Sequence, residues 1–69
     1  MPYLIGEMSD GIVVAVEVNT AVFKSFNKMA KNAGRMGTKY DFIGEIFTSI
    51  KAGGGELNED SIRQYISES

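Results

Sequence analysis

Alternating and β-branched residues near the start of the chain predict a β-hairpin. The sequence of residues 3–18, YLIGEMSDGIVVAVEV, is interrupted by Asp10-Gly11 near its middle, a pattern typical of two strands joined by a tight turn. A two-residue loop at Asp10-Gly11 would mix polar and apolar side chains on one face, whereas a three-residue loop over 9–11 separates them better. We therefore expect the three-residue loop, with Gly11 in the left-handed conformation that closes such loops.

This register predicts one apolar face and one mixed face of the hairpin. The apolar face carries Leu4, Gly6, Met8, Ile12, Val14 and Val16, and the other carries Tyr3, Ile5, Glu7, Val13, Ala15 and Glu17. Because an isolated hairpin is only marginally stable in water, other elements must cover its apolar face. The second face is itself half apolar, and a homodimer through the hairpin is one way in which it could be covered.

Apolar residues then recur at intervals of three and four, which predicts a first amphipathic helix. Asn19 or Thr20 can cap its start, because a short oxygen-bearing side chain accepts from the free amides of the first turn. Gly34 or Gly37 ends the helix. Its expected buried stripe contains Val22, Phe23, Phe26, Met29, Ala30 and Ala33.

Two further helices are predicted after residue 37. Thr38, with Asp41 three residues later, indicates the start of the second helix, and the glycines at 53–55 end it in a flexible or sharply turning connection. Gly44 inside this helix costs about 1 kcal/mol relative to alanine, so we expect a close helix contact there. Asn58 can cap a short third helix. The expected buried residues are Phe42, Ile43, Ile46, Phe47 and Ile50 in the second helix and Ile62, Tyr65 and Ile66 in the third.

The expected fold is α+β, a β-hairpin followed by three helices (ββααα), in one small domain over residues 1–69. A chain of 69 residues is near the lower size at which a hydrophobic core is stable unaided. It has no Cys and no His, so disulfides and thiolate or imidazole metal ligands are excluded. The longest apolar stretch, 12–16, is too short to cross a bilayer, and we expect a soluble, cytoplasmic protein.

The titratable residues do not favour an enzyme. Without His or Cys, the commonest general bases and nucleophiles are absent. Glu56, Glu59 and Asp60 cluster at the predicted start of the third helix, where acids usually serve the helix dipole and solubility. They could attract a divalent cation, but they lack the ligand spacing of a calcium loop. We therefore expect no catalytic residue, no metal site and no cofactor.

Positive charge is concentrated in the middle of a chain whose net charge is −2. Residues 20–39 contain no acid and five of the seven basic residues, which are Lys24, Lys28, Lys31, Arg35 and Lys39. On a helix the first four fall within about 60° of one another, opposite the apolar stripe. Like charges four residues apart repel, so this face is slightly destabilising unless something negative approaches it. Acids of the same chain, a second subunit, an acidic partner protein or a phosphate backbone could do so.

The loop after this face contains the pattern Gly34-x-x-Gly37. Over about ten residues it resembles the glycine loop of the KH family, in which close backbone approach clamps a nucleic-acid backbone. The resemblance implies phosphate contacts near Gly34 and Gly37, although the glycine run and short helix that follow depart from that family's further sheet. The alternative interpretation is that both glycines are helix C-cap and turn residues. Gly37-Thr38-Lys39 also reverses the order of Lys and Ser/Thr found in a phosphate-binding P-loop.

These patterns favour a non-catalytic module that binds another macromolecule. Our first hypothesis is a small regulatory or inhibitory protein, similar in size to phage or mobile-element regulators, that binds an acidic protein through the cationic helix face or the hairpin edge. The alternative is a nucleic-acid-binding protein in which the basic helix and the Gly34-x-x-Gly37 loop contact phosphates. The aromatic residues are not interleaved with the lysines as in a base-stacking platform, and this favours protein as the partner.

Overall fold

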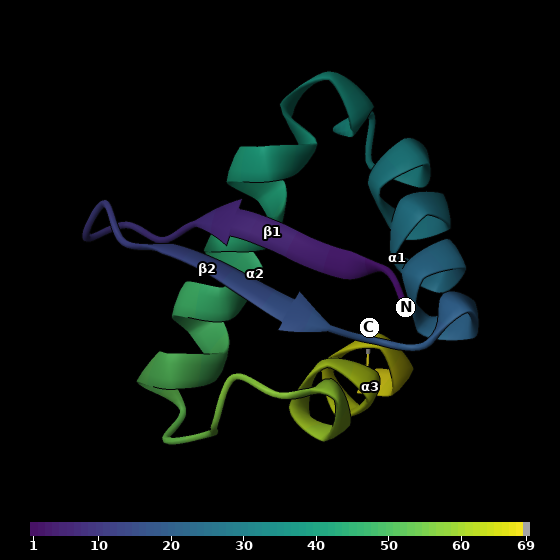
Figure 1. Cartoon of the computed structure of the whole chain (residues 1–69). Coiled ribbons are helices and arrows are strands. Elements are labelled where there is room, and N and C mark those ends of the chain that lie inside the picture. The colour runs from purple at the N-terminus through teal and green to yellow at the C-terminus, as the bar shows by residue number, and fades with distance from the viewer. Residues whose placement is uncertain (69) are drawn as a thin grey trace.

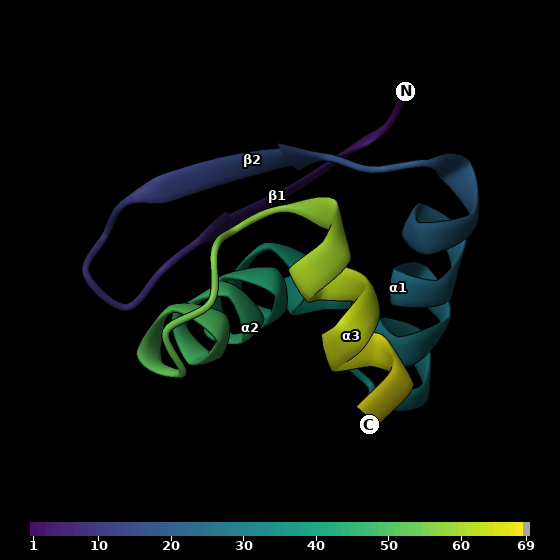
Figure 2. The same ribbon diagram turned by 90° about the horizontal axis from the view of Figure 1, so that it is seen from below.

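A two-stranded sheet lies against three helices in the computed structural model of the chain, which describes residues 1–68 (Figure 1). The elements follow the predicted order ββααα, with one turn of 3₁₀ helix, η1, before the second helix. Their bounds are β1 Tyr3–Glu7, β2 Val13–Glu17, α1 Thr20–Asn32, η1 Met36–Thr38, α2 Lys39–Ala52 and α3 Glu59–Glu68. Seen from below, the helices lie to one side of the hairpin and leave its other side open (Figure 2).

The hairpin has the register that the sequence predicts. Leu4 is opposite Val16, and the backbone N–H of Met8 donates to the carbonyl oxygen of Ile12 at 2.9 Å, so the loop comprises residues 9–11. Gly11 has a φ of 85°, which places it in the left-handed region that glycine adopts without strain. The three-residue loop and the role of Gly11 are both confirmed.

The two faces of the hairpin differ in burial as the register requires. Leu4, Gly6, Met8 and Val16 are buried against the helices, while Ile12, on the same face, remains exposed because the hairpin tip extends past α2 (Figure 1). On the outer face, Tyr3, Ile5 and Val13 are 52%, 46% and 54% exposed. Within residues 1–68, no element covers this outer face (Figure 2).

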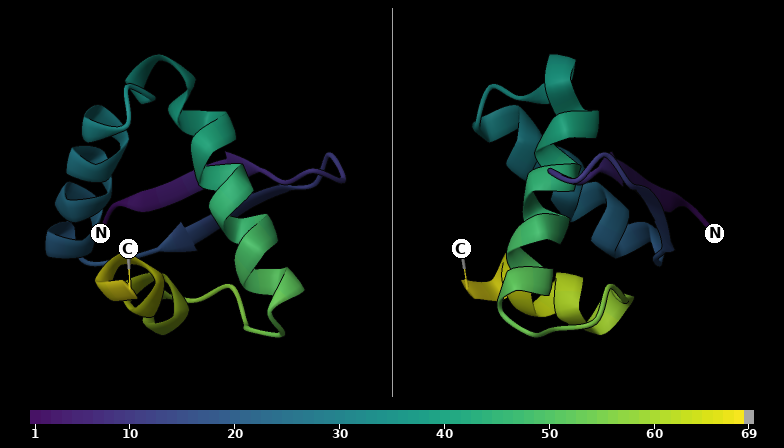
Figure 3. Two further views of the ribbon diagram at one scale, coloured as in Figure 1. Left: turned by 180° about the vertical axis from the view of Figure 1, so that it is seen from behind. Right: turned by 90° about the vertical axis from the view of Figure 1, so that its left-hand side faces the viewer.

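Helix α2 crosses the inner face of the hairpin and touches β1 through glycine (Figure 3). A Cβ on Gly44 would overlap the carbonyl oxygen of Glu7, and a Cβ on Gly6 would lie 2.5 Å from the backbone nitrogen of Gly44. Both glycines are buried. The close contact predicted at Gly44 is therefore present, and its partner is a strand rather than another helix.

Thr48 fixes the end of β1 to the same helix. Its Oγ1 donates to the carbonyl oxygen of Gly44 at 2.9 Å and accepts from the backbone N–H of Ser9 at 3.2 Å. Strand and helix are thus joined by backbone contact at Gly44 and by a side-chain hydrogen bond one turn later.

The core lies between the inner face of the hairpin and the three helices. Its largest fully buried side chains are Phe26, Phe47, Leu4, Ile62 and Val18. Phe26 of α1 and Phe42 of α2 meet edge to face with ring centroids 6.0 Å apart, an arrangement that the aromatic quadrupoles favour. The predicted helix stripes are all buried or half-buried except at Ala33, which follows the last residue of α1 and is exposed.

Glycines end α1 and α2 with the same motif. Gly34 has a φ of 69°, the N–H of Arg35 donates to the carbonyl of Ala30 at 2.7 Å, and the N–H of Gly34 donates to that of Lys31 at 3.0 Å. Gly54, with a φ of 84°, repeats this pattern after α2. These are Schellman motifs, in which a left-handed residue satisfies the last helix carbonyls. The run at 53–55 is therefore a sharp turn.

The helix starts follow the predicted caps with one exception. Asn19 Oδ1 accepts from the N–H of Val22 at 2.9 Å, and the side chain of Asn58 caps α3 in the same way. Thr38 precedes α2 as predicted, but its side chain makes no capping hydrogen bond. Its Oγ1 instead accepts from Nε of Arg35 at 2.8 Å. The predicted helix start at Thr38 is therefore confirmed, although its side chain does not act as a cap.

We predict that Gly44→Ala strongly destabilises the fold. The new Cβ would collide with the β1 backbone at Glu7. Overpacking that shifts the backbone costs about 1–3 kcal/mol, and we expect the upper end of this range because the colliding atoms are backbone atoms. Urea unfolding followed by circular dichroism measures the loss. Ser49→Ala, at an exposed site of the same helix, is the control and should gain a few tenths of a kcal/mol, about the difference in helix propensity. A Gly44→Ala midpoint equal to or above that of the control would contradict the contact.

Candidate binding surfaces

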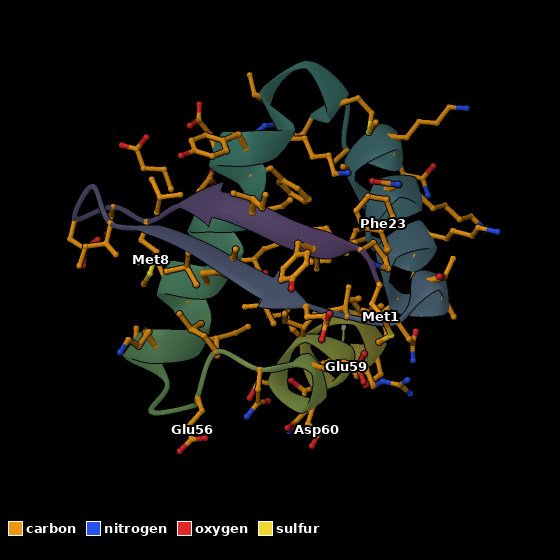
Figure 4. The ribbon with its side chains drawn as sticks, viewed as in Figure 1. Met1, Met8, Phe23, Glu56, Glu59 and Asp60 are labelled. Carbon is orange, nitrogen blue, oxygen red and sulfur yellow. The ribbon has the colours of Figure 1, made fainter. Side chains whose placement is uncertain are left out.

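Three of the predicted cationic residues form an open surface on α1, which we call the α1 lysine face. Its members, Lys24, Lys28 and Lys31, are all exposed, and nitrogen-tipped side chains project from α1 away from the hairpin (Figure 4). Their spacing of four and three residues places them on one side of the helix. Within residues 1–68, no carboxylate forms an ion pair with any of them.

Arg35 lies beyond the end of α1 and is held by the same chain. Its guanidinium pairs with Oε2 of Glu45 at 2.6 Å, its Nε donates to Thr38, and its centre lies 5.3 Å from the ring centroid of Phe42. The sequence predicts Arg35 in line with the helix lysines, whereas the structure directs it across the loop to α2. Arg35 therefore serves first to fix the α1–α2 connection.

Lys39, at the first position of α2, packs on an aromatic ring of α1. Its Nζ lies 4.4 Å from the ring centroid of Phe23, a distance suited to a cation–π interaction. Phe23 is half-buried, and Figure 4 shows it beside the beginning of β1. The sequence assigns aromatic and basic residues of this region to separate faces, and at Lys39 and Phe23 the structure brings the two kinds together.

Lys39 and Phe23 belong to a groove that the sequence does not predict. The groove, which we call the β1 groove, has a volume of about 260 Å³ and lies where β1, α1 and α2 meet. It is lined by Tyr3, Ile5, Phe23, Lys39, Tyr40 and Ile43. Tyr40 is 42% exposed. The half-apolar outer side of β1 is the only sequence signal for this groove, because its other walls depend on how the two helices pack.

The Gly34-x-x-Gly37 loop has two glycines with different roles. Gly34 takes the left-handed conformation that ends α1, whereas Gly37 has an ordinary φ, and a Cβ there would meet no atom within 4 Å. Arg35 between them is turned toward Glu45. The helix C-cap interpretation therefore accounts for Gly34. The backbone conformation at Gly37 does not require glycine.

Among the acidic residues around the start of α3, Glu59 has a structural role. Oε1 of Glu59 accepts from the backbone N–H of Asn19 at 2.6 Å, which joins the start of α3 to the start of α1. Oε2 of Glu59 lies 3.6 Å from Arg63. Figure 4 shows Glu56 apart from Glu59 and Asp60. In the part of the chain that is described, no group of three or more acidic side chains could hold a metal ion.

The comparisons with other proteins do not assign this chain to a protein family, and the lengths of its helices do not indicate a functional class. Family models, curated proteins and solved structures were compared with it, and no match was found. Among residues 1–68, no helix has the length and apolar character needed to cross a membrane. The surfaces themselves, the α1 lysine face and the β1 groove, are the features that bear on function.

We predict that the two glycines of the loop respond differently to alanine. Gly34→Ala forces a left-handed conformation on an L-residue and should cost about 1 kcal/mol, while Gly37→Ala should leave the free energy of unfolding within about 0.5 kcal/mol of wild type. Thermal and urea unfolding of the two variants provide the comparison. Equal losses at both positions would mean that Gly37 is also required by the backbone.

Proposed function

We propose that this protein is a non-catalytic binding module that recognises an acidic partner protein through the α1 lysine face. The observation that carries the proposal is the cluster of Lys24, Lys28 and Lys31, exposed on one side of α1 and unpaired with any carboxylate of residues 1–68. The chain itself has more acidic than basic residues, yet none of the described acids forms an ion pair with this face. A module of this kind regulates or inhibits by occupying its partner.

The lysine face has a physical reason to bind. Neighbouring lysines repel at Lys24–Lys28 and Lys28–Lys31, each pair by about 0.2–0.5 kcal/mol. An acidic surface relieves this repulsion and adds long-range attraction, which raises the association rate and disfavours basic competitors. The same charges contribute little to folding, so their cost is consistent with a surface used for recognition.

Protein is favoured over nucleic acid by the positions of Arg35 and Lys39. A phosphate-binding surface would gain from all five cations, but Arg35 is paired with Glu45 and Lys39 lies over Phe23. Three lysines on a helix, without an adjacent stacking platform, resemble an electrostatic docking patch more than a groove for a strand. Nucleic acid is accordingly an outcome that the experiment must detect.

The test is affinity capture from a soluble extract of the source cells, with and without nuclease treatment. Wild type is compared with Lys24→Gln/Lys28→Gln/Lys31→Gln, and the control is Lys51→Glu/Ala52→Glu at two exposed sites at the end of α2, on the opposite side of the molecule from α1 (Figure 1). Both variants lower the net charge by the same amount, so a difference between them reports position rather than total charge. We expect the triple variant to lose an acidic protein that wild type and control retain.

Two results would contradict the proposal. Capture that is equal for all three proteins would move the contact away from the lysine face. Capture that disappears after nuclease treatment, together with a steep loss of binding to DNA or RNA as salt rises, would identify a nucleic acid as the partner.

A further inference from the structure

Part of the outer edge of β1 has unused backbone hydrogen-bonding groups. The bonds from Met8 N–H to Ile12 and from Val18 N–H to Pro2 place the even-numbered residues in the bonded pairs. In an antiparallel ladder the amides and carbonyls of the alternate residues then point away from the partner strand. At Tyr3 and Ile5 these groups face outward, and within residues 1–68 no hydrogen bond reaches them from another element.

The rest of the same edge is occupied by α2. The carbonyl of Glu7 faces Gly44, and the amide of Ser9 donates to Thr48. The open section is therefore short and defined, beginning at Tyr3 and ending where α2 crosses the strand. An unpaired edge of this kind is a template for another extended chain.

The β1 groove lies directly beside this open section. Tyr3 and Ile5 form one wall, and Phe23, Tyr40 and Ile43 supply apolar surface from the two helices. An extended chain paired with β1 would direct alternate side chains into the groove and into solvent. Apolar side chains at the inward positions would cover surface that is now exposed on Tyr3, Ile5 and Tyr40.

Lys39 adds a charge preference to the groove. Its Nζ lies over Phe23 and pairs with no carboxylate among residues 1–68. Lys39 lines the same groove as Tyr3 and Ile5, so a positive charge lies near the open edge. A carboxylate on the incoming chain would form an ion pair next to an aromatic ring.

We propose that the open edge of β1 and the β1 groove together bind a short extended segment of a partner protein that carries alternating apolar residues and a carboxylate. Backbone pairing at Tyr3 and Ile5 gives affinity, and the groove and Lys39 give selectivity. The helices α1 and α2 both extend past β1 on the side away from β2 (Figures 1 and 3). An extended segment needs only the open edge and the β1 groove, whereas a second copy of this chain would also bring its own helices to this side.

This proposal rests on the proposed function in one respect, namely that the partner is a protein. The surface that it uses is a different one.

The test uses a library of random linear peptides, which is panned on wild type. The affinity of the selected peptides is then measured by fluorescence anisotropy. Ile5→Pro removes the outward amide of β1 without removing a β1–β2 hydrogen bond. Ala15→Pro makes the same change at the directly opposite residue, on the outer edge of β2, and is the matched control.

We expect the selected peptides to contain alternating apolar residues with Asp or Glu. Ile5→Pro and Lys39→Glu should each weaken binding about tenfold, which corresponds to about 1.4 kcal/mol, while Ala15→Pro should match wild type. Circular dichroism checks each fold, and Tyr40→Ala, a change of an exposed side chain in the groove, gives a second test if Ile5→Pro does not fold. Neutralising the α1 lysine face should leave peptide binding unchanged, so the two surfaces are tested independently.

The proposal is overturned if panning enriches no peptide, or if the selected peptides bind the groove variants as tightly as they bind wild type. It is also overturned if sedimentation shows a dimer of wild type that Ile5→Pro dissociates, because the occupant of the edge would then be a second copy. Neither of these results would affect the lysine-face experiment, in which the triple lysine variant is expected to lose the captured acidic protein.

Discussion

The backbone of α2 approaches the backbone of β1 closely because glycine stands on both sides of their contact, at Gly6 and at Gly44. No other residue type fits either position without displacing strand or helix. This contact places Ile43, Ile46 and Phe47 under the hairpin, where they are buried. In a chain that has no Cys and no His, close packing of the core is the main source of stability. The cost of a glycine inside α2 is offset because the close approach lets the neighbouring side chains pack against the hairpin.

The same contact determines which surfaces remain open. Helix α2 takes the inner face of a two-stranded sheet and the far end of the β1 edge, while α1 continues past the sheet and is packed mainly through Val22, Phe26 and Ala30. The outer side of α1 and the near end of β1 therefore have no covering element among the described residues. The α1 lysine face and the β1 groove are both consequences of a small sheet that supports helices longer than itself.

Local signals made much of this fold predictable from the sequence. The position of Gly11 and the alternation of side chains are sufficient for the hairpin register, and Asn19, Asn58 and Gly34 mark helix ends because their effects act within a few residues. These features depend on neighbours in the chain, and the structure confirms them.

The parts that could not be predicted involve residues far apart in the sequence. The hydrogen bond from Asn19 to Glu59 joins residues 40 apart, and the pairing of Arg35 with Glu45 directs Arg35 away from the helix lysines with which the sequence aligns it. The stacking of Lys39 on Phe23 likewise needs the angle between α1 and α2. Hydrophobic periodicity gives the buried face of each helix but not the helix crossing, so the cationic surface could be foreseen at Lys24, Lys28 and Lys31 and not at Arg35 or Lys39.

The central claim is that α2 covers the outer edge of β1 from Glu7 to Ser9 and leaves the adjacent section at Tyr3 and Ile5 open. Backbone amide hydrogen exchange, measured by NMR on the isolated protein, tests this residue by residue. The account predicts slow exchange of the Ser9 amide, which donates to Thr48 of α2, and rapid exchange of the Ile5 amide, although both point to the same side of the hairpin. An Ile5 amide as protected as that of Ser9 would show that the edge is already occupied and would contradict the account.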